Sequence, residues 1–232
     1  MKLPPPFDSV QLDVERSLHD YLHVTTAQIS QVIIVGAYGA DEVERMHMTY
    51  PNARFLCFEP NPATNQQLQV KFANKSHVTL SRMALGSAPG KTMFHELSMP
   101  GTGSLLEPDL DSLSAFCRQK SEEVAAFEVN VSTLDLEAKS LPVVDLLWMD
   151  VQGAEGKVLE GGAETLKRTK SVFLEIALAS LPYQGAALFP ELAARLQARQ
   201  FTCVGLGVDA WNGTGNAFFV KDFGSLICKQ PA

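Results

Sequence analysis

Two carboxylates on either side of a glycine turn follow a largely apolar run of the chain. The run 143–149 ends at Asp150, and Gly153 lies between Asp150 and Glu155. Near-continuous hydrophobicity is typical of a parallel strand covered on both faces, and open α/β sheets bind ligands beyond the carboxyl ends of their strands. Asp150 is therefore predicted at the chemically active sheet edge, as a base for a substrate hydroxyl. The alternative is purely structural: both carboxylates would only close a strand and start a helix.

A glycine-bearing turn and a third carboxylate follow the first two predicted strands. The strand 31–36 leads into Gly36-Ala37-Tyr38-Gly39, and the strand 54–58 ends at Glu59-Pro60. Glycines between a strand and a helix let a ligand approach backbone N–H groups. A carboxylate at the end of the second strand can accept hydrogen bonds from both ribose hydroxyls. The pattern predicts a nucleoside site, and replacing Glu59 with Ala is expected to weaken binding while leaving fold stability nearly unchanged.

Two more strand ends complete the predicted site. The strand 77–83 leads to Ala84 and Leu85, whose apolar atoms and backbone N–H groups suit an adenine ring. The strand 170–176 carries Glu175 at its exit. In a sheet of order 3-2-1-4-5, the strand before Asp150 lies between the strands of Gly36 and Glu175, so Glu175 is predicted as a second catalytic carboxylate. Two carboxylates facing one pocket could also hold a divalent cation, which is an alternative to the metal-free site predicted here.

Strands and helices alternate along most of the chain. This alternation, with two final strands that have no full helix between them, predicts an α/β fold. The expected sheet is mostly parallel and seven-stranded, with an antiparallel edge strand and helices on both faces. Residues 1–30 have helical spacing and are predicted to form an N-terminal helical arm, while residues 31–232 form the main domain.

One region, residues 91–134, breaks the alternation and is predicted to be an insertion at the mouth of the site. Residues 91–97 and 127–134 alternate between apolar and polar side chains, as two paired strands would. Between them lies a polar, glycine-bearing stretch, of which 98–108 is expected to be more mobile than the sheet until ligands bind.

Composition excludes several classes of partner. The net charge is −7, so the clustered Lys and Arg of a nucleic-acid surface are not expected. No apolar run reaches the ~20 residues that span a bilayer, and the first residues lack the apolar stretch of a secretory signal, so a cytoplasmic location is predicted. The four Cys and five His lack ligand spacing, which argues against a metal site or a disulfide framework.

Taken together, the ordered motifs resemble those of the FkbM family of methyltransferases. The resemblance covers roughly residues 32–176 and rests on six stretches: Val35-Gly36-Ala37-x-Gly39, Phe58-Glu59-Pro60-Asn61-Pro62, Ala84-Leu85-Gly86, Val129-x-Val131-x-Thr133-Leu134-Asp135, Met149-Asp150-Val151-Gln152-Gly153-Ala154-Glu155 and Leu159-Glu160-Gly161-Gly162. It implies a Rossmann-like class I methyltransferase that binds S-adenosyl-L-methionine. The implied acceptor is a small molecule, with O-methylation of a hydroxyl on a sugar or natural product.

The chain departs from the family pattern at three positions. Val35 and Tyr38 stand where the family usually has Asp and Asn, and Gln152 stands where Glu is more frequent. Two other functions therefore remain open. One is a nicotinamide-dependent oxidoreductase, because Glu59 would bind that ribose equally well. The other is a catalytically inactive cofactor-binding protein that serves as a partner subunit.

Overall fold

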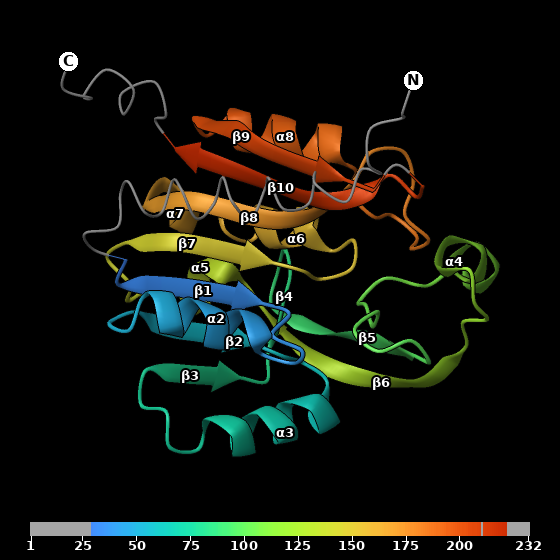
Figure 1. Cartoon of the computed structure of the whole chain (residues 1–232), viewed down its shortest axis with the longest axis horizontal. Coiled ribbons are helices and arrows are strands. Elements are labelled where there is room, and N and C mark those ends of the chain that lie inside the picture. The colour runs from blue at the N-terminus through green and yellow to red at the C-terminus, as the bar shows by residue number, and fades with distance from the viewer. Residues whose placement is uncertain (1–28, 210, 222–232) are drawn as a thin grey trace, which may run out of the picture.

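The computed structural model of the chain describes residues 29–209 and 211–221 (Figure 1). The predicted N-terminal arm therefore lies almost entirely outside the described residues. The helices are α2 (Asp41–Thr49), α3 (Pro62–Phe72), α4 (Leu110–Cys117), α5 (Leu134–Glu137), α6 (Glu155–Glu160), α7 (Ala163–Lys167) and α8 (Phe189–Gln197). The strands are β1 (Gln31–Val35), β2 (Arg54–Phe58), β3 (Val78–Ser81), β4 (Ala84–Leu85), β5 (Gly90–Leu97), β6 (Glu123–Ser132), β7 (Val144–Met149), β8 (Thr169–Ala177), β9 (Phe201–Val208) and β10 (Thr214–Lys221).

The main sheet has seven strands in the order β3-β2-β1-β7-β8-β10-β9. β10 is antiparallel to both of its neighbours, and the pairs from β3 through to β8 are parallel. The predicted α/β class and the mostly parallel seven-stranded sheet are confirmed. The antiparallel strand lies one place in from the edge, because the final hairpin inserts β10 next to β8 and leaves β9 outside.

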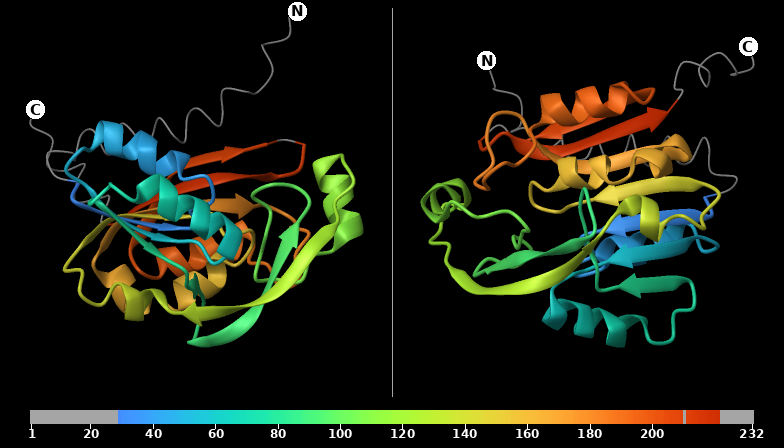
Figure 2. Two further views of the ribbon diagram at one scale, coloured as in Figure 1. Left: turned by 90° about the horizontal axis from the view of Figure 1, so that it is seen from below. Right: turned by 180° about the vertical axis from the view of Figure 1, so that it is seen from behind.

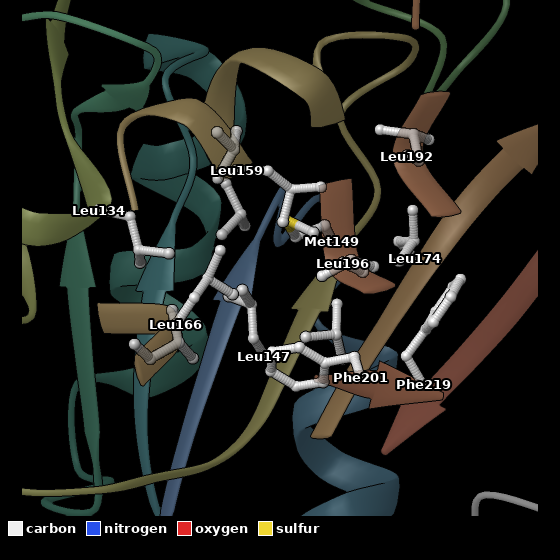
Figure 3. Packing of buried hydrophobic residues seen from close by; sticks show 14 of the residues in the cluster. Leu134, Leu147, Met149, Leu159, Leu166, Leu174, Leu192, Leu196, Phe201 and Phe219 are labelled. Carbon is white, nitrogen blue, oxygen red and sulfur yellow. The ribbon is translucent and has the colours of Figure 1, made fainter. Parts of the chain in front are cut away.

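Both faces of this sheet are covered by helices, as the two views in Figure 2 show. On one face, Leu146 and Trp148 of β7 pack in a cluster with residues of α2 and α3. On the other face, Leu147 and Met149 pack with α6, α7 and α8 (Figure 3). β7 is buried along its whole length. This two-sided burial explains why its sequence is nearly continuous in apolar residues instead of alternating.

A second, three-stranded sheet is formed by β4, β6 and β5, in that order. β5 and β6 pair antiparallel with Phe94 opposite Phe127, so the two alternating stretches of the sequence do pair, with β6 beginning at Glu123. The segment between them, including α4, extends from the carboxyl edge of the main sheet (Figure 1). The parallel register of β1 with β2 and with β7 brings the carboxyl ends of these three strands together at that edge. No helix among the described residues is long and apolar enough to cross a membrane.

Candidate active site

The turn after β1 holds two strand ends in contact. Gly36 has φ 86°, and a Cβ at this position would lie 1.9 Å from the backbone oxygen of Asp150. The Gly36 and Ala37 N–H groups both donate to the Phe58 carbonyl, at 3.0 and 3.1 Å. Glycine is therefore required here because the chain that leaves β7 passes against the β1 turn. This contact places Asp150 beside the turn, as the strand order predicted.

Glu59 is fixed at the end of β2 by two backbone donors. Its side chain is only 5% exposed, Oε2 accepts the Tyr38 N–H at 3.1 Å, and Oε1 accepts the Asn61 N–H at 2.9 Å. Burial raises the pKa of Glu59 to about 7. This geometry argues against the expectation that Glu59→Ala leaves fold stability nearly unchanged, because the change would remove the acceptor of the buried Asn61 N–H and of the partly buried Tyr38 N–H.

A cavity of about 460 Å³ opens above these strand ends, within the size range of cofactor pockets. Seven of the eight residues predicted to bind cofactor line it: Gly36, Gly39, Glu59, Pro60, Ala84, Leu85 and Asp150. The eighth, Ala37, is fully buried and packs in the core with α2 and α3. Ala37 therefore contributes a backbone donor and core packing to the turn.

The cavity lining is acidic. Its described residues include five carboxylates, namely Asp41, Glu42, Glu59, Glu96 and Asp150, and they include no Lys, Arg or His. A cavity with this lining favours a cationic ligand, because each carboxylate lowers the electrostatic potential inside it. It disfavours a pyrophosphate, which proteins usually bind with cations or with a helix N-terminus free of nearby acids.

The side-chain amide of Gln152 bridges Asp150 and Glu175 at the sheet edge. The Gln152 Nε2 donates to Asp150 Oδ1 at 2.7 Å and to Glu175 Oε2 at 2.8 Å. Asp150 lines the cavity and is solvent-exposed there, whereas Glu175 is half-buried within β8 and does not line it. The structure thus brings the two predicted catalytic carboxylates together, but only Asp150 can reach a molecule in the cavity.

The surroundings of this pair disfavour negative charge. Burial, followed by the negative charges of Asp150 and Glu155, raises the pKa of Glu175 well above its usual range. Although Asp150 is accessible from the cavity, the protein atoms packed around it partly desolvate its carboxylate and raise its pKa, while the hydrogen bond from Gln152 opposes that rise. Glu155 is 1% exposed, accepts the Val151 N–H at 2.9 Å, and has its pKa raised by burial to about 7. Glu155 therefore holds the loop after β7 in shape, which is the structural role considered for it.

The second wall of the cavity comes from the predicted insertion, whose individual lining side chains were missed by sequence reasoning. Its lining residues are Phe94, Glu96, Leu97, Ser98, Met99, Pro100, Gly101, Gly103, Ser104 and Leu105. The Ser104 hydroxyl donates to the Gln152 carbonyl at 2.9 Å, and the Tyr183 hydroxyl donates to the Thr102 carbonyl at 2.7 Å. The two glycines at 101 and 103 were the available signal, although they do not reveal which side chains face the cavity.

Two of the motifs in the sequence are structural. The Asp135 carboxylate accepts the N–H groups of Glu164 and Thr165, at 3.0 and 2.6 Å, and so caps the start of α7. In return the Asp135 N–H donates to the Gly161 carbonyl. A Cβ at Gly161 would lie 2.0 Å from the Gly86 carbonyl oxygen. These residues join the second sheet to the helices below the site and do not reach the cavity.

Comparisons with known proteins agree with this architecture. The model of a family described as the methyltransferase FkbM domain matches residues 35–203. The 2-O-methyltransferase NoeI of Sinorhizobium fredii is 28% identical over 165 residues, covering 66% of this chain and 65% of that protein. The chain thus spans 65% of the length of the curated relative that it matches. A solved fibrillarin/Nop5p complex has the same fold, with a TM-score of 0.50 and 11% identity over 83% of this chain and 72% of that one.

Proposed function

Because the chain belongs to the FkbM methyltransferase family, we propose that it transfers a methyl group from S-adenosyl-L-methionine to a hydroxyl group of a sugar or another small natural product. The acidic cavity carries this proposal. S-adenosylmethionine bears a positive sulfonium and a positive ammonium group, and the five carboxylates of the lining match that charge. The name of the relative, a 2-O-methyltransferase, supports oxygen as the acceptor atom.

The residues of the cavity fit this cofactor. Each oxygen of Glu59 uses one lone pair on a backbone N–H and keeps another for a ribose hydroxyl. Ala84 and Leu85 offer apolar atoms for the adenine ring, and the Gly36–Gly39 turn offers close backbone approach. When bound, the cofactor supplies an electrophilic methyl group. The negative charge of Asp150 stands at the strand end nearest the Gly36 turn.

Asp150 is the proposed proton acceptor. A neutral hydroxyl attacks poorly unless a base takes its proton as the new bond forms, and a positioned carboxylate can do this. The insertion wall, with Phe94, Leu97 and Leu105, faces the strand ends and holds the acceptor in line with the methyl group. The reaction leaves the acceptor's proton on Asp150, from which it returns to solvent at the exposed strand end.

Calorimetric titration of the chain with S-adenosylmethionine, S-adenosylhomocysteine and NAD tests the cofactor. S-adenosylmethionine and S-adenosylhomocysteine are expected to bind, and NAD is expected not to bind. A preference for NAD would instead favour the oxidoreductase. Incubation with labelled cofactor and a panel of methyl glycosides then tests transfer. Tight cofactor binding with no transfer to any glycoside or phenol would favour the inactive partner subunit, an alternative kept open by Val35 and Tyr38.

We propose that residues 31–232 form one methyltransferase domain with an insertion at about 91–134. A cytoplasmic location is supported by the free thiols of Cys57, Cys117 and Cys203. A small-molecule acceptor, and neither a nucleic acid nor a membrane, is the proposed partner, since an acidic cavity repels phosphate.

A further inference from the structure

Gln152 occupies an unusual position for a residue with a side chain. Its φ is 52°, a left-handed conformation that costs a residue other than glycine free energy. The conformation is held from two sides. Its carbonyl accepts the Ser104 hydroxyl at 2.9 Å, and its side-chain amide contacts both Asp150 and Glu175. The strain is therefore compensated by contacts that aim the amide at the carboxyl pair.

Hydrogen-bond counting limits where the protons of this pair can lie. A primary amide has two N–H donors, and Gln152 directs them to Asp150 Oδ1 and Glu175 Oε2. Both of those oxygens must therefore be acceptors. Because the same amide nitrogen contacts both carboxyl groups, two full negative charges here would lie close together with no cation of the described residues between them. A single proton on the pair relieves this repulsion, and it lies on an oxygen that Gln152 does not contact.

The groups around the pair decide which carboxyl keeps this proton. Glu175 faces the negative charges of Asp150 and Glu155 and lies away from the cavity. Tyr183 also lies near the pair; burial raises its pKa, so it stays neutral and adds no charge to the pair. Asp150, in contrast, is open to solvent in the cavity. Negative charge is better solvated on Asp150, and the proton is better placed on Glu175.

We propose that Gln152 is a positioning residue: by donating one amide N–H to each carboxyl group it holds the pair together without adding charge, so that the proton stays on the more enclosed Glu175 and Asp150 remains the free proton acceptor. This proposal rests on the proposed function and deepens it, since it assigns Glu175 to hold a proton instead of contacting the acceptor. It also gives a reason for Gln in place of Glu at this position. A third carboxylate would bring no donor and would add negative charge beside Asp150.

Carbon-13 NMR of labelled Asp and Glu side chains tests this in the full chain without any acceptor. Carboxyl shifts are followed from pH 4 to 10 in the parent, Gln152→Glu and Gln152→Met, with Asp150→Asn and Glu175→Gln used to assign the signals. In the parent, Asp150 should ionise at a lower pH than Glu175. In both Gln152 variants the Asp150 midpoint should rise, by about one pH unit or more in Gln152→Glu, where like charge is added.

Gln197→Glu is the matched control, because it adds the same charge at an exposed position of α8. It should leave the Asp150 midpoint unchanged. Thermal unfolding of each variant identifies any loss of fold, and the order of the two midpoints in the parent tests the proposal even if a variant does not fold. An Asp150 midpoint equal in parent and both Gln152 variants, or a proton held longer by Asp150 than by Glu175, would overturn the proposal. Failure of the proposed function is separate, because it would appear as absent S-adenosylmethionine binding in the parent.

Discussion

The cavity has two walls that are built in different ways. The sheet-edge wall, from the ends of β1, β2 and β7, is set by parallel strand register and by backbone bonds such as that from Gly36 N–H to the Phe58 carbonyl. In the insertion wall, residues 94–97 belong to β5 and pair with β6, whereas the loop 98–105 is held largely by side-chain bonds from Tyr183 and Ser104 and by one antiparallel bridge between His95 and Ser104. The first wall is part of the main sheet, while the loop of the second is attached to the rest of the protein at a few points.

This difference suggests a division of labour. The sheet edge carries the residues that we propose bind S-adenosylmethionine, and its geometry cannot shift without disturbing the core. The insertion can change its side chains at little cost to the fold, so it is the part that can adapt to a particular acceptor. Substitutions in the first wall should therefore affect chemistry and cofactor strongly, and those in the second should act locally.

The largest effect is expected from Asp150→Asn. The change keeps an oxygen that can accept the Gln152 bond but removes the proton acceptor. The methyl-transfer rate to a responsive glycoside should fall by about 10²–10⁴, while affinity for S-adenosylmethionine changes only a few-fold. Asp111→Asn, which removes the same charge from exposed α4, is the control. Full activity in Asp150→Asn would remove this residue from the mechanism.

Glu59→Ala and Glu96→Ala compare one carboxylate from each wall. Glu59→Ala should weaken cofactor binding by about 10- to 150-fold, corresponding to roughly 1.5–3 kcal/mol for charge-assisted bonds. It should also lower the melting temperature, because the Tyr38 and Asn61 N–H groups lose their acceptor. Glu96 accepts one side-chain bond, from Asn61, so its removal should cost less in both measurements. If the two variants reduced cofactor affinity and melting temperature by equal amounts, the distinction between the walls would be contradicted.

The sheet-edge wall can be predicted from the sequence more fully than the insertion wall, because strand register fixes the first and tertiary contacts fix the second. Asp150, Glu59 and the Gly36 turn could be placed from the sequence because strand ends in a parallel sheet must share an edge. Gln152 could not, since its role depends on a left-handed φ and on a carboxylate 23 residues away. The insertion side chains could not be placed either. Their positions depend on tertiary contacts, such as Tyr183 with Thr102, that no local periodicity encodes.

The ionisation of Glu59 makes the sheet edge sensitive to pH in two opposite ways. With a pKa of about 7, Glu59 is mostly protonated at pH 5.5 and then carries no charge for the cofactor. Affinity for S-adenosylmethionine should fall by about ten-fold between pH 8 and pH 5.5.

The stability of the free protein should change in the opposite direction, because Glu59 and Glu155 both have pKa values raised from 4.5 to about 7. Between those values the folded state binds more protons than the unfolded state, so lowering the pH stabilises the fold.

Thermal unfolding at pH 5.5 and pH 8, with and without cofactor, measures both effects. The melting temperature of the free protein is expected to be higher at pH 5.5, and the increase caused by cofactor is expected to be larger at pH 8. Glu59→Ala should lose most of the pH dependence of affinity and retain the part of the stability change that Glu155 supplies. A cofactor-induced increase that is the same at both pH values would show that the charge on Glu59 does not take part in binding.

The smallest effect is expected for Tyr183→Phe, which removes one bond between the loop after β8 and the insertion wall. The Tyr183 hydroxyl is the donor to the Thr102 carbonyl, so its loss should cost about 0.5–1.5 kcal/mol. Hydrogen exchange should become faster in residues 98–108 while exchange in β7 stays at the parent's rate. In the parent, segment 98–108 should exchange faster than the sheet and become protected when cofactor and acceptor bind. If Tyr183→Phe accelerates exchange equally in β7, the insertion belongs to the cooperative core and the proposed division between the two walls is wrong.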